Sequence, residues 1–100
     1  MNNKLKDELT DNLFEAILLL KNVDECYSFF EDIGTVNEIK GFAQRLKVAE
    51  MLRAGYKYTN ISEVTGASPA TISRVSRCLN YGADGYNLVL DRLENVRLAP

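Results

Sequence analysis

The chain contains no histidine. This absence removes the side chain that most often acts as a general base or a metal ligand, and with it Ser–His and Cys–His nucleophile pairs. Only two cysteines are present, Cys26 and Cys78, and two cysteines so far apart in sequence cannot alone form a structural zinc site. We therefore expect no catalytic site, no metal and no cofactor, and we predict that the protein is not an enzyme.

Long apolar runs are also absent. No stretch of 18 apolar residues is present to form a transmembrane helix, and the polar, acidic start MNNKLKDELTDN is not typical of a signal peptide. Nothing in the sequence indicates export, so we interpret both cysteines as reduced, buried thiols. These observations predict a cytoplasmic protein that has no membrane partner.

The chain has little net charge, −2 in total, but the charge is unevenly distributed. Residues 1–39 carry three lysines against nine acidic side chains, a net charge of −6. Residues 40–78 carry seven basic side chains against two acidic ones, a net charge of +5. Attraction to phosphate depends on the local field, so the basic segment is compatible with nucleic-acid binding despite the acidic total.

Apolar periodicity predicts one all-α domain of six helices, with no strand pattern and no repeat. Expected helices cover about residues 4–21, 23–32, 36–54, 60–65, 69–81 and 84–95, and residues 96–100 form a frayed tail. The predicted N-caps are Asn22, Thr35, Thr59 and Ser68, of which the first two are followed three residues later by glutamate. Glycines 34, 55, 66 and 82 are expected to end helices.

The first predicted helix is more apolar than one neighbouring helix requires. Its apolar side chains are Leu5, Leu9, Leu13, Phe14, Ile17, Leu18 and Leu20. The third predicted helix has an inner face of Ile39, Phe42, Ala43, Leu46, Ala49 and Leu52. A chain of 100 residues builds only a small core of its own. The excess predicts a homodimer, and the alternative is a self-contained monomeric bundle.

Residues 59–81 have the layout of a helix-turn-helix, two short helices joined by a tight turn that contains a glycine. The side chains expected at the crossing are Ile61, Val64, Ala67, Ile72, Val75 and Leu79, with the small Ser62 beside them. The opposite face of the second helix carries Ala70, Thr71, Ser73, Arg74 and Arg77. Small hydroxyls and arginines suit a helix that enters the major groove. The alternative is an ordinary helical hairpin with a solvated face, which leaves the lack of Glu, Asp and Lys there unexplained.

The words QRLKVAEMLRAG at 44–55 and GASPATISRVS at 66–76 resemble the Trp repressor superfamily, especially its YerC/YecD-type branch. The resemblance covers most of the chain. It implies a six-helix subunit in an intertwined homodimer and a single Trp-repressor-like domain over residues 1–100. The helices of about 4–54 and 84–95 are expected to form the dimer, and the helix-turn-helix of about 59–81 is expected to bind double-stranded DNA.

The resemblance also implies which residues meet DNA, because in this family the start of the second helix reads the operator. We expect apolar contacts from Pro69 and Ala70, and direct or water-mediated hydrogen bonds from Thr71 and Ser73. The full expected set of DNA-binding residues is Lys57, Thr59, Ser68, Pro69, Ala70, Thr71, Ser73, Arg74 and Arg77. Tyr56 and Tyr58 are expected either to contact phosphates or to pack under the first helix of the helix-turn-helix.

Arg45 and Arg74 match the tryptophan-binding arginines of the family, and Thr35 falls on a pocket position. The repressor has glycine after its second arginine, whereas this chain has Val75, which fills the space of an indole ring. We expect a DNA-binding transcriptional regulator, a repressor, that does not depend on tryptophan. The alternatives are a repressor that binds another small molecule between Arg45 and Arg74, or a helix-turn-helix that binds a polypeptide. For the two arginines, salt bridges or phosphate contacts are the other interpretation.

Overall fold

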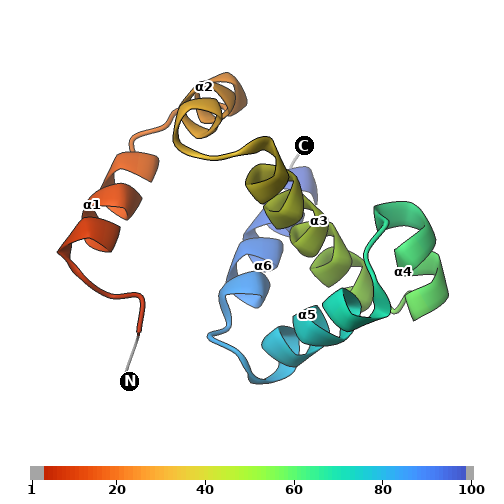
Figure 1. Ribbon diagram of the computed structural model, residues 1–100. Helices are drawn as coiled ribbons and strands as arrows, with labels where there is room; N and C mark the ends of the chain where they lie inside the picture. The colour runs from red at the N-terminus through yellow and green to blue at the C-terminus, as the bar shows by residue number, and fades with distance from the viewer. Residues whose placement is uncertain (1–3, 99–100) are drawn as a thin grey trace. The chain divides into compact units, whose positions relative to one another are not determined.

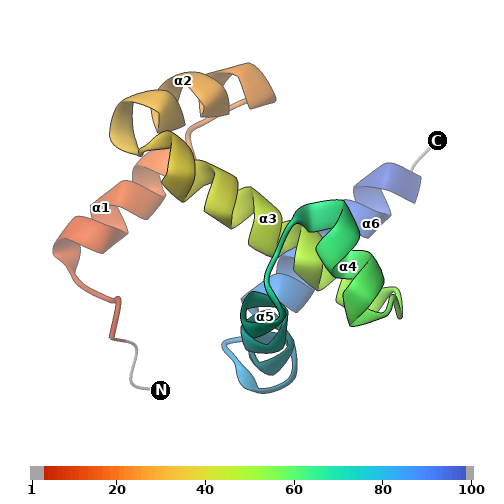
Figure 2. The ribbon, with the colours of Figure 1, turned by 45° about the vertical axis from the view of Figure 1, so that its right-hand side comes forward.

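The computed structural model describes residues 4–98, which are entirely helical apart from short connections (Figures 1 and 2). The helices are α1 (Glu8–Ile17), α2 (Val23–Ile33), α3 (Val36–Arg53), α4 (Tyr58–Thr65), α5 (Pro69–Tyr81) and α6 (Gly85–Leu98). The all-α, six-helix fold is therefore confirmed. Within residues 4–98, no helix combines the length and apolarity needed to cross a membrane. The chain divides after Val36 into two compact units, which are described separately below.

In the first unit, α1 is shorter than the predicted helix of residues 4–21. It begins after Asp7, whose carboxylate accepts a hydrogen bond from the Thr10 amide at 2.7 Å. This bond satisfies one of the amides that a helix start leaves free, and it also lowers the pKa of the Asp7 carboxyl. After Ile17 the chain tightens into a turn, so the leucines at 18–20 lie outside the helix.

Helix α2 has the predicted cap. The side-chain oxygen of Asn22 accepts a hydrogen bond from the Glu25 amide at 2.9 Å, and the Glu25 carboxylate accepts one from the Lys21 amide at 2.8 Å. Gly34 follows the last residue of α2 and ends the helix, as predicted. Neither α1 nor α2 contains a buried residue, and Leu9 and Leu18 are 84% and 83% exposed. Much of the apolar excess of the N-terminal segment is therefore exposed in the single chain.

The second unit contains the hydrophobic core, which lies where α4, α5 and α6 meet the C-terminal half of α3 (Figure 2). Its buried side chains are Val48, Ala49, Met51, Ile61, Ala67, Ile72, Val75 and Leu90. The predicted inner face of α3 is partly wrong, because Phe42 and Ala43 are exposed whereas Val48 and Met51 are buried. This half of α3 packs against the helix-turn-helix on one side and against α6 on another. It therefore buries side chains on more than one side, and a single apolar stripe does not predict them.

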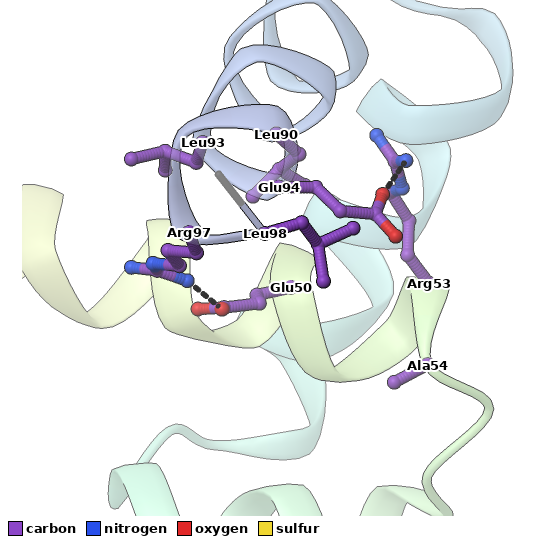
Figure 3. Close-up of a pocket in the computed structure, with 8 residues that line it drawn as sticks. All are labelled: Glu50, Arg53, Ala54, Leu90, Leu93, Glu94, Arg97 and Leu98. Carbon is purple, nitrogen blue, oxygen red and sulfur yellow. Dashed lines mark hydrogen bonds and ion pairs between the residues drawn. The ribbon is translucent and has the colours of Figure 1, made fainter. Parts of the chain in front are cut away.

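Ion pairs connect α3 with α6 across a surface groove (Figure 3). Arg97 donates a hydrogen bond to the Glu50 carboxylate, and this bond is the main reason why the pKa of Glu50 lies below its ordinary value. The contact also corrects the predicted frayed tail, since α6 continues to Leu98. Residues 99–100 of that predicted tail lie outside the described residues.

Candidate nucleic-acid interface

Helices α4 and α5 and the turn between them form a helix-turn-helix, called the reading head below (residues 58–81). Helix α4 ends at Gly66, whose φ of 74° lies in the left-handed region that favours glycine. The turn is then fixed by three side-chain bonds. Ser62 Oγ donates to the Ala67 carbonyl at 2.9 Å, Thr65 Oγ1 donates to the Ile61 carbonyl at 2.7 Å, and the Ala67 amide donates to Thr65 Oγ1 at 3.1 Å. The predicted glycine turn is confirmed.

The crossing of α4 and α5 is closely packed. Ile61, Ala67, Ile72 and Val75 are each no more than 2% exposed, and Leu79 packs against them. Val64, the sixth side chain predicted to point inward, is 63% exposed, so that prediction is wrong. Thr65 instead occupies the inner side of the last turn of α4, where its hydroxyl bonds the backbone of the turn.

The start of α5 is capped by Ser68, as predicted. Ser68 Oγ accepts a hydrogen bond from the Thr71 amide at 3.2 Å and donates one to Thr71 Oγ1 at 3.1 Å. Pro69 occupies the first turn, where its missing N–H leaves no bond unmade. Thr71 Oγ1 donates no hydrogen bond to a residue of the range 4–98, so this side chain can donate one to an outside acceptor.

The outer face of α5 is exposed and basic. Ala70, Ser73, Arg74 and Arg77 are all exposed, while Thr71 is half-buried. Neither guanidinium forms an ion pair or hydrogen bond with a residue of the described range 4–98. No acidic residue occurs within Pro69–Tyr81. Both positive charges therefore remain available to an external anion.

The start of α4 differs from its prediction. The predicted cap, Thr59, lies inside the first turn of α4, and the N-cap is Lys57, which makes no side-chain cap bond. The reason is that the Lys57 carbonyl already accepts the first helical bond, from the Ile61 amide at 3.0 Å. Both residues are exposed at one end of the reading head. Tyr56 and Tyr58 are about half exposed, at 52% and 44%, so neither is packed fully under the helix.

The residues of the predicted ligand pocket have different surroundings. The Arg45 guanidinium lies over the Phe42 ring at 5.2 Å on α3, and Arg74 is exposed on α5. Val75 is 1% exposed, and so belongs to the crossing. Thr35 is exposed and belongs to the first unit.

The prediction of buried thiols is wrong. Both cysteines are free, but Cys26 is partly buried and Cys78 is exposed. Helix α5 turns Ile72, Val75 and Leu79 inward, which leaves the position of Cys78 outside the core. Neither thiol is part of the crossing.

Sequence reasoning missed the polar side chains that hold the reading head. Gln44 on α3 donates to the Thr65 carbonyl, and Asn87 on α6 donates to the Leu79 carbonyl on α5. Both bonds join residues from different helices. Gln44 is the first residue of the segment QRLKVAEMLRAG, but no rule of sequence spacing predicts that it contacts the turn.

Known proteins are similar to this chain in sequence and in structure. The family model of the Trp repressor protein matches residues 8–94. The uncharacterized protein YerC of Bacillus subtilis (strain 168) is 56% identical over 92 residues, which is 92% of this chain and 88% of YerC. The crystal structure of a TrpR like protein from Eubacterium eligens ATCC 27750 is 58% identical, with a TM-score of 0.89 over 93% of this chain and 96% of that one. A Staphylococcus aureus crystal structure is 53% identical, with a TM-score of 0.87 over 91% of both chains.

The family match includes all residues of the reading head. The family model spans α1 to α6 except for the last residues of α6, and both solved structures superpose over nine-tenths of the chain. The six helices and the helix-turn-helix are the features of DNA-binding transcription regulators of this kind. The chain therefore belongs to the Trp repressor family.

Proposed function

We propose that the protein is a sequence-specific regulator of transcription, a repressor, that binds double-stranded DNA as a homodimer and reads it with α5. The observation that carries the proposal is the outer face of α5, where two unpaired arginines and small hydroxyl side chains stand over a buried crossing. A helix of this kind can enter a major groove about 12 Å wide without an acidic side chain to repel the phosphates.

The reading head offers separate groups for bases and for backbone. At the start of α5, Pro69 and Ala70 present only apolar atoms, which suit a thymine methyl group. Thr71 and Ser73 present hydroxyls to base edges, directly or through water. Because Thr71 Oγ1 already accepts a hydrogen bond from Ser68, its hydroxyl is suited to donate one to an acceptor on a base.

Phosphates are bound by Arg74 and Arg77 on one side of the reading head, and by Lys57 and Thr59 at the start of α4. Ser68 supports these contacts indirectly because it caps α5 and holds Thr71.

A second copy of the chain completes the binding unit. Leu9 of α1 and Leu18 and Leu19 of the turn after it are exposed, and no residue of α1 or α2 is buried in the single chain. Apolar surface of this extent on a small protein favours association. Two reading heads related by a two-fold axis then meet half-sites about one helical turn of DNA apart.

Two substitutions test which residues of the reading head contact bases and which contact phosphates. Thr71→Ala keeps the backbone cap at Ser68, so the fold stays intact, and is expected to remove about 1 kcal/mol of preference at one base position. Arg77→Ala is expected to weaken binding to all sequences alike and to reduce the salt dependence by about one charge per subunit, or about two for the dimer. Fluorescence anisotropy on a panel of duplexes measures both effects. The assignment of roles fails if Arg77→Ala changes base preference or if Thr71→Ala weakens every duplex equally.

We further propose that DNA binding does not depend on tryptophan. Val75 is 1% exposed and belongs to the packed crossing, where it stabilises the reading head. Accommodating an indole beside this valine overpacks the site, which costs typically about 1–3 kcal/mol. Tryptophan binding is then weaker by roughly ten- to hundredfold than in a repressor with glycine at this position.

Calorimetry with L-tryptophan, together with DNA titrations with and without it, measures this independence. We expect unchanged DNA affinity in its presence. A Val75→Gly variant that becomes tryptophan-dependent would support the argument. Low-micromolar binding of tryptophan that also raises DNA affinity would show it to be wrong.

A further inference from the structure

The last carbonyl of α4 is bonded from outside the reading head. Gln44 of α3 donates from Nε2 to the Thr65 carbonyl at 3.1 Å. A helix leaves its last carbonyls without partners within the helix, so an outside donor satisfies a group that otherwise faces solvent or stays unpaired. Gln44 is also the side-chain neighbour of Gly66, with its amide nitrogen 3.9 Å from where a Cβ would lie. One α3 side chain therefore contacts the turn directly.

The turn transmits this contact to the start of α5. Thr65, which Gln44 holds, also accepts a hydrogen bond from the Ala67 amide, and Ser62 bonds the Ala67 carbonyl. Ala67 is 2% exposed and directly precedes Ser68, the cap of α5. The N-terminal end of α5 is thus connected to α3 by an unbroken series of hydrogen bonds and one buried residue.

The other end of α5 is held in a similar way. Asn87 of α6 donates from Nδ2 to the Leu79 carbonyl at 3.1 Å, in the last turn of α5, and to the Asp84 carboxylate at 3.0 Å. Asn87 is itself bonded by Arg53 of α3, whose Nη1 donates to the Asn87 carbonyl at 3.3 Å. Arg53 in turn pairs with Asp91 at 2.8 Å. It also pairs with Glu94 at 3.8 Å (Figure 3).

We propose that Gln44 and Asn87 are positioning residues: Gln44 of α3 holds the turn that leads into α5, Asn87 holds the last turn of α5 to α6, and together they set the angle at which the recognition helix meets DNA. This pair is called the polar clamp below, and its role in recognition rests on the proposed function. The apolar crossing drives the helices together but is non-directional, so it permits small rotations and shifts. The hydrogen bonds to the Thr65 carbonyl before the turn and to the Leu79 carbonyl in the last turn of α5 are directional, and they restrict such movements. Base readout needs this restriction, because side chains must reach base edges with little positional error.

The test uses substitutions that remove the donor and keep the size of the side chain. Gln44→Met and Asn87→Leu remove the two clamp bonds, and Gln44→Lys restores a donor at the first position. Asn95→Leu is the matched control, since Asn95 is an exposed amide on α6. Each protein is studied as the full chain, by native-state hydrogen exchange and by titration with a selected duplex and a random duplex.

We expect Gln44→Met to speed exchange of the Gly66 and Ala67 amides by about five- to tenfold, and to leave core amides of α3 unchanged. Asn87→Leu is expected to have the corresponding local effect in the last turn of α5. Either variant lowers the ratio of selected to random affinity by about tenfold, and both together lower it further. Gln44→Lys restores slow exchange in the turn, and the control changes neither readout.

The outcomes separate this proposal from the proposed function. A wild-type chain that binds no duplex overturns the proposed function, while the exchange data still decide whether the clamp bonds restrain the turn. Unchanged exchange in both variants overturns the polar clamp. Faster exchange with an unchanged affinity ratio also overturns it, because the bonds would then stabilise the fold without positioning α5 for recognition.

Discussion

Ile61→Ala is expected to lower the free energy of unfolding by about 2–5 kcal/mol. Ile61 is fully buried on α4, in contact with the core of α3 and α5. Removing three carbons there costs their transfer energy and leaves a cavity that the hydrogen-bonded turn cannot readily close. For a domain of this size the loss is a large fraction of the total stability. Urea denaturation followed by circular dichroism measures it.

Val64→Ala is the matched control, because it shortens another β-branched side chain of the same helix. Val64 is 63% exposed, so the expected change is within about 0.5 kcal/mol. Equal losses in the two variants would contradict the packing of the reading head described above.

This pair of residues also shows the limit of sequence reasoning in the reading head. Apolar character predicts an inward position for both, and for Ile61 the prediction is confirmed. Helix α4 has only 8 residues, which is too short for periodicity to define its inner side. A hydrogen-bonded Thr65 takes the position that the pattern assigns to Val64. In α4, the hydrogen bonds of Thr65 therefore decide which side of the helix faces inward, and the hydrophobic pattern alone does not.

The ends of helices are predicted more reliably than their inner faces, because caps and turns depend on residues that are neighbours in sequence. The caps at Asn22 and Ser68 and the turn at Gly66 depend on neighbouring residues, and all three are confirmed. Thr59 fails because the main chain enters the helix earlier, at Lys57. The hydrogen bonds from Gln44 of α3 to the end of α4 and from Asn87 of α6 to α5 join different helices, so local sequence rules could not have indicated them. The DNA-contacting residues stay a prediction.

A second large effect is expected on self-association. The double variant Leu9→Asp and Leu18→Asp places two charges on side chains that are more than 80% exposed in the single chain. In a dimer that covers this face, each substitution loses roughly 1.5–3 kcal/mol of apolar burial and adds an unpaired charge. The dimer dissociation constant is then expected to rise by at least about a hundredfold.

Sedimentation equilibrium at micromolar concentration measures this effect. The wild-type protein is expected to sediment at twice its chain mass of 11.3 kDa, and the double variant as the single chain. Val64→Asp is the control, since it adds a charge to an exposed apolar position of the reading head and leaves the dimer intact. A wild-type species of 11.3 kDa, or a double variant that still dimerises with unchanged affinity, would rule out this interface.

Selection of bound duplexes from a random-sequence library, without tryptophan and at physiological salt, tests the central claim most directly. We predict enrichment of a two-fold symmetric site whose half-sites lie about one helical turn apart. Affinity for the enriched duplex is expected to fall steeply with rising salt, as release of counterions by Arg74, Arg77 and their partner copies requires. A library that shows no enriched sequence, together with an affinity that stays flat between low and physiological salt, would contradict DNA recognition by α5.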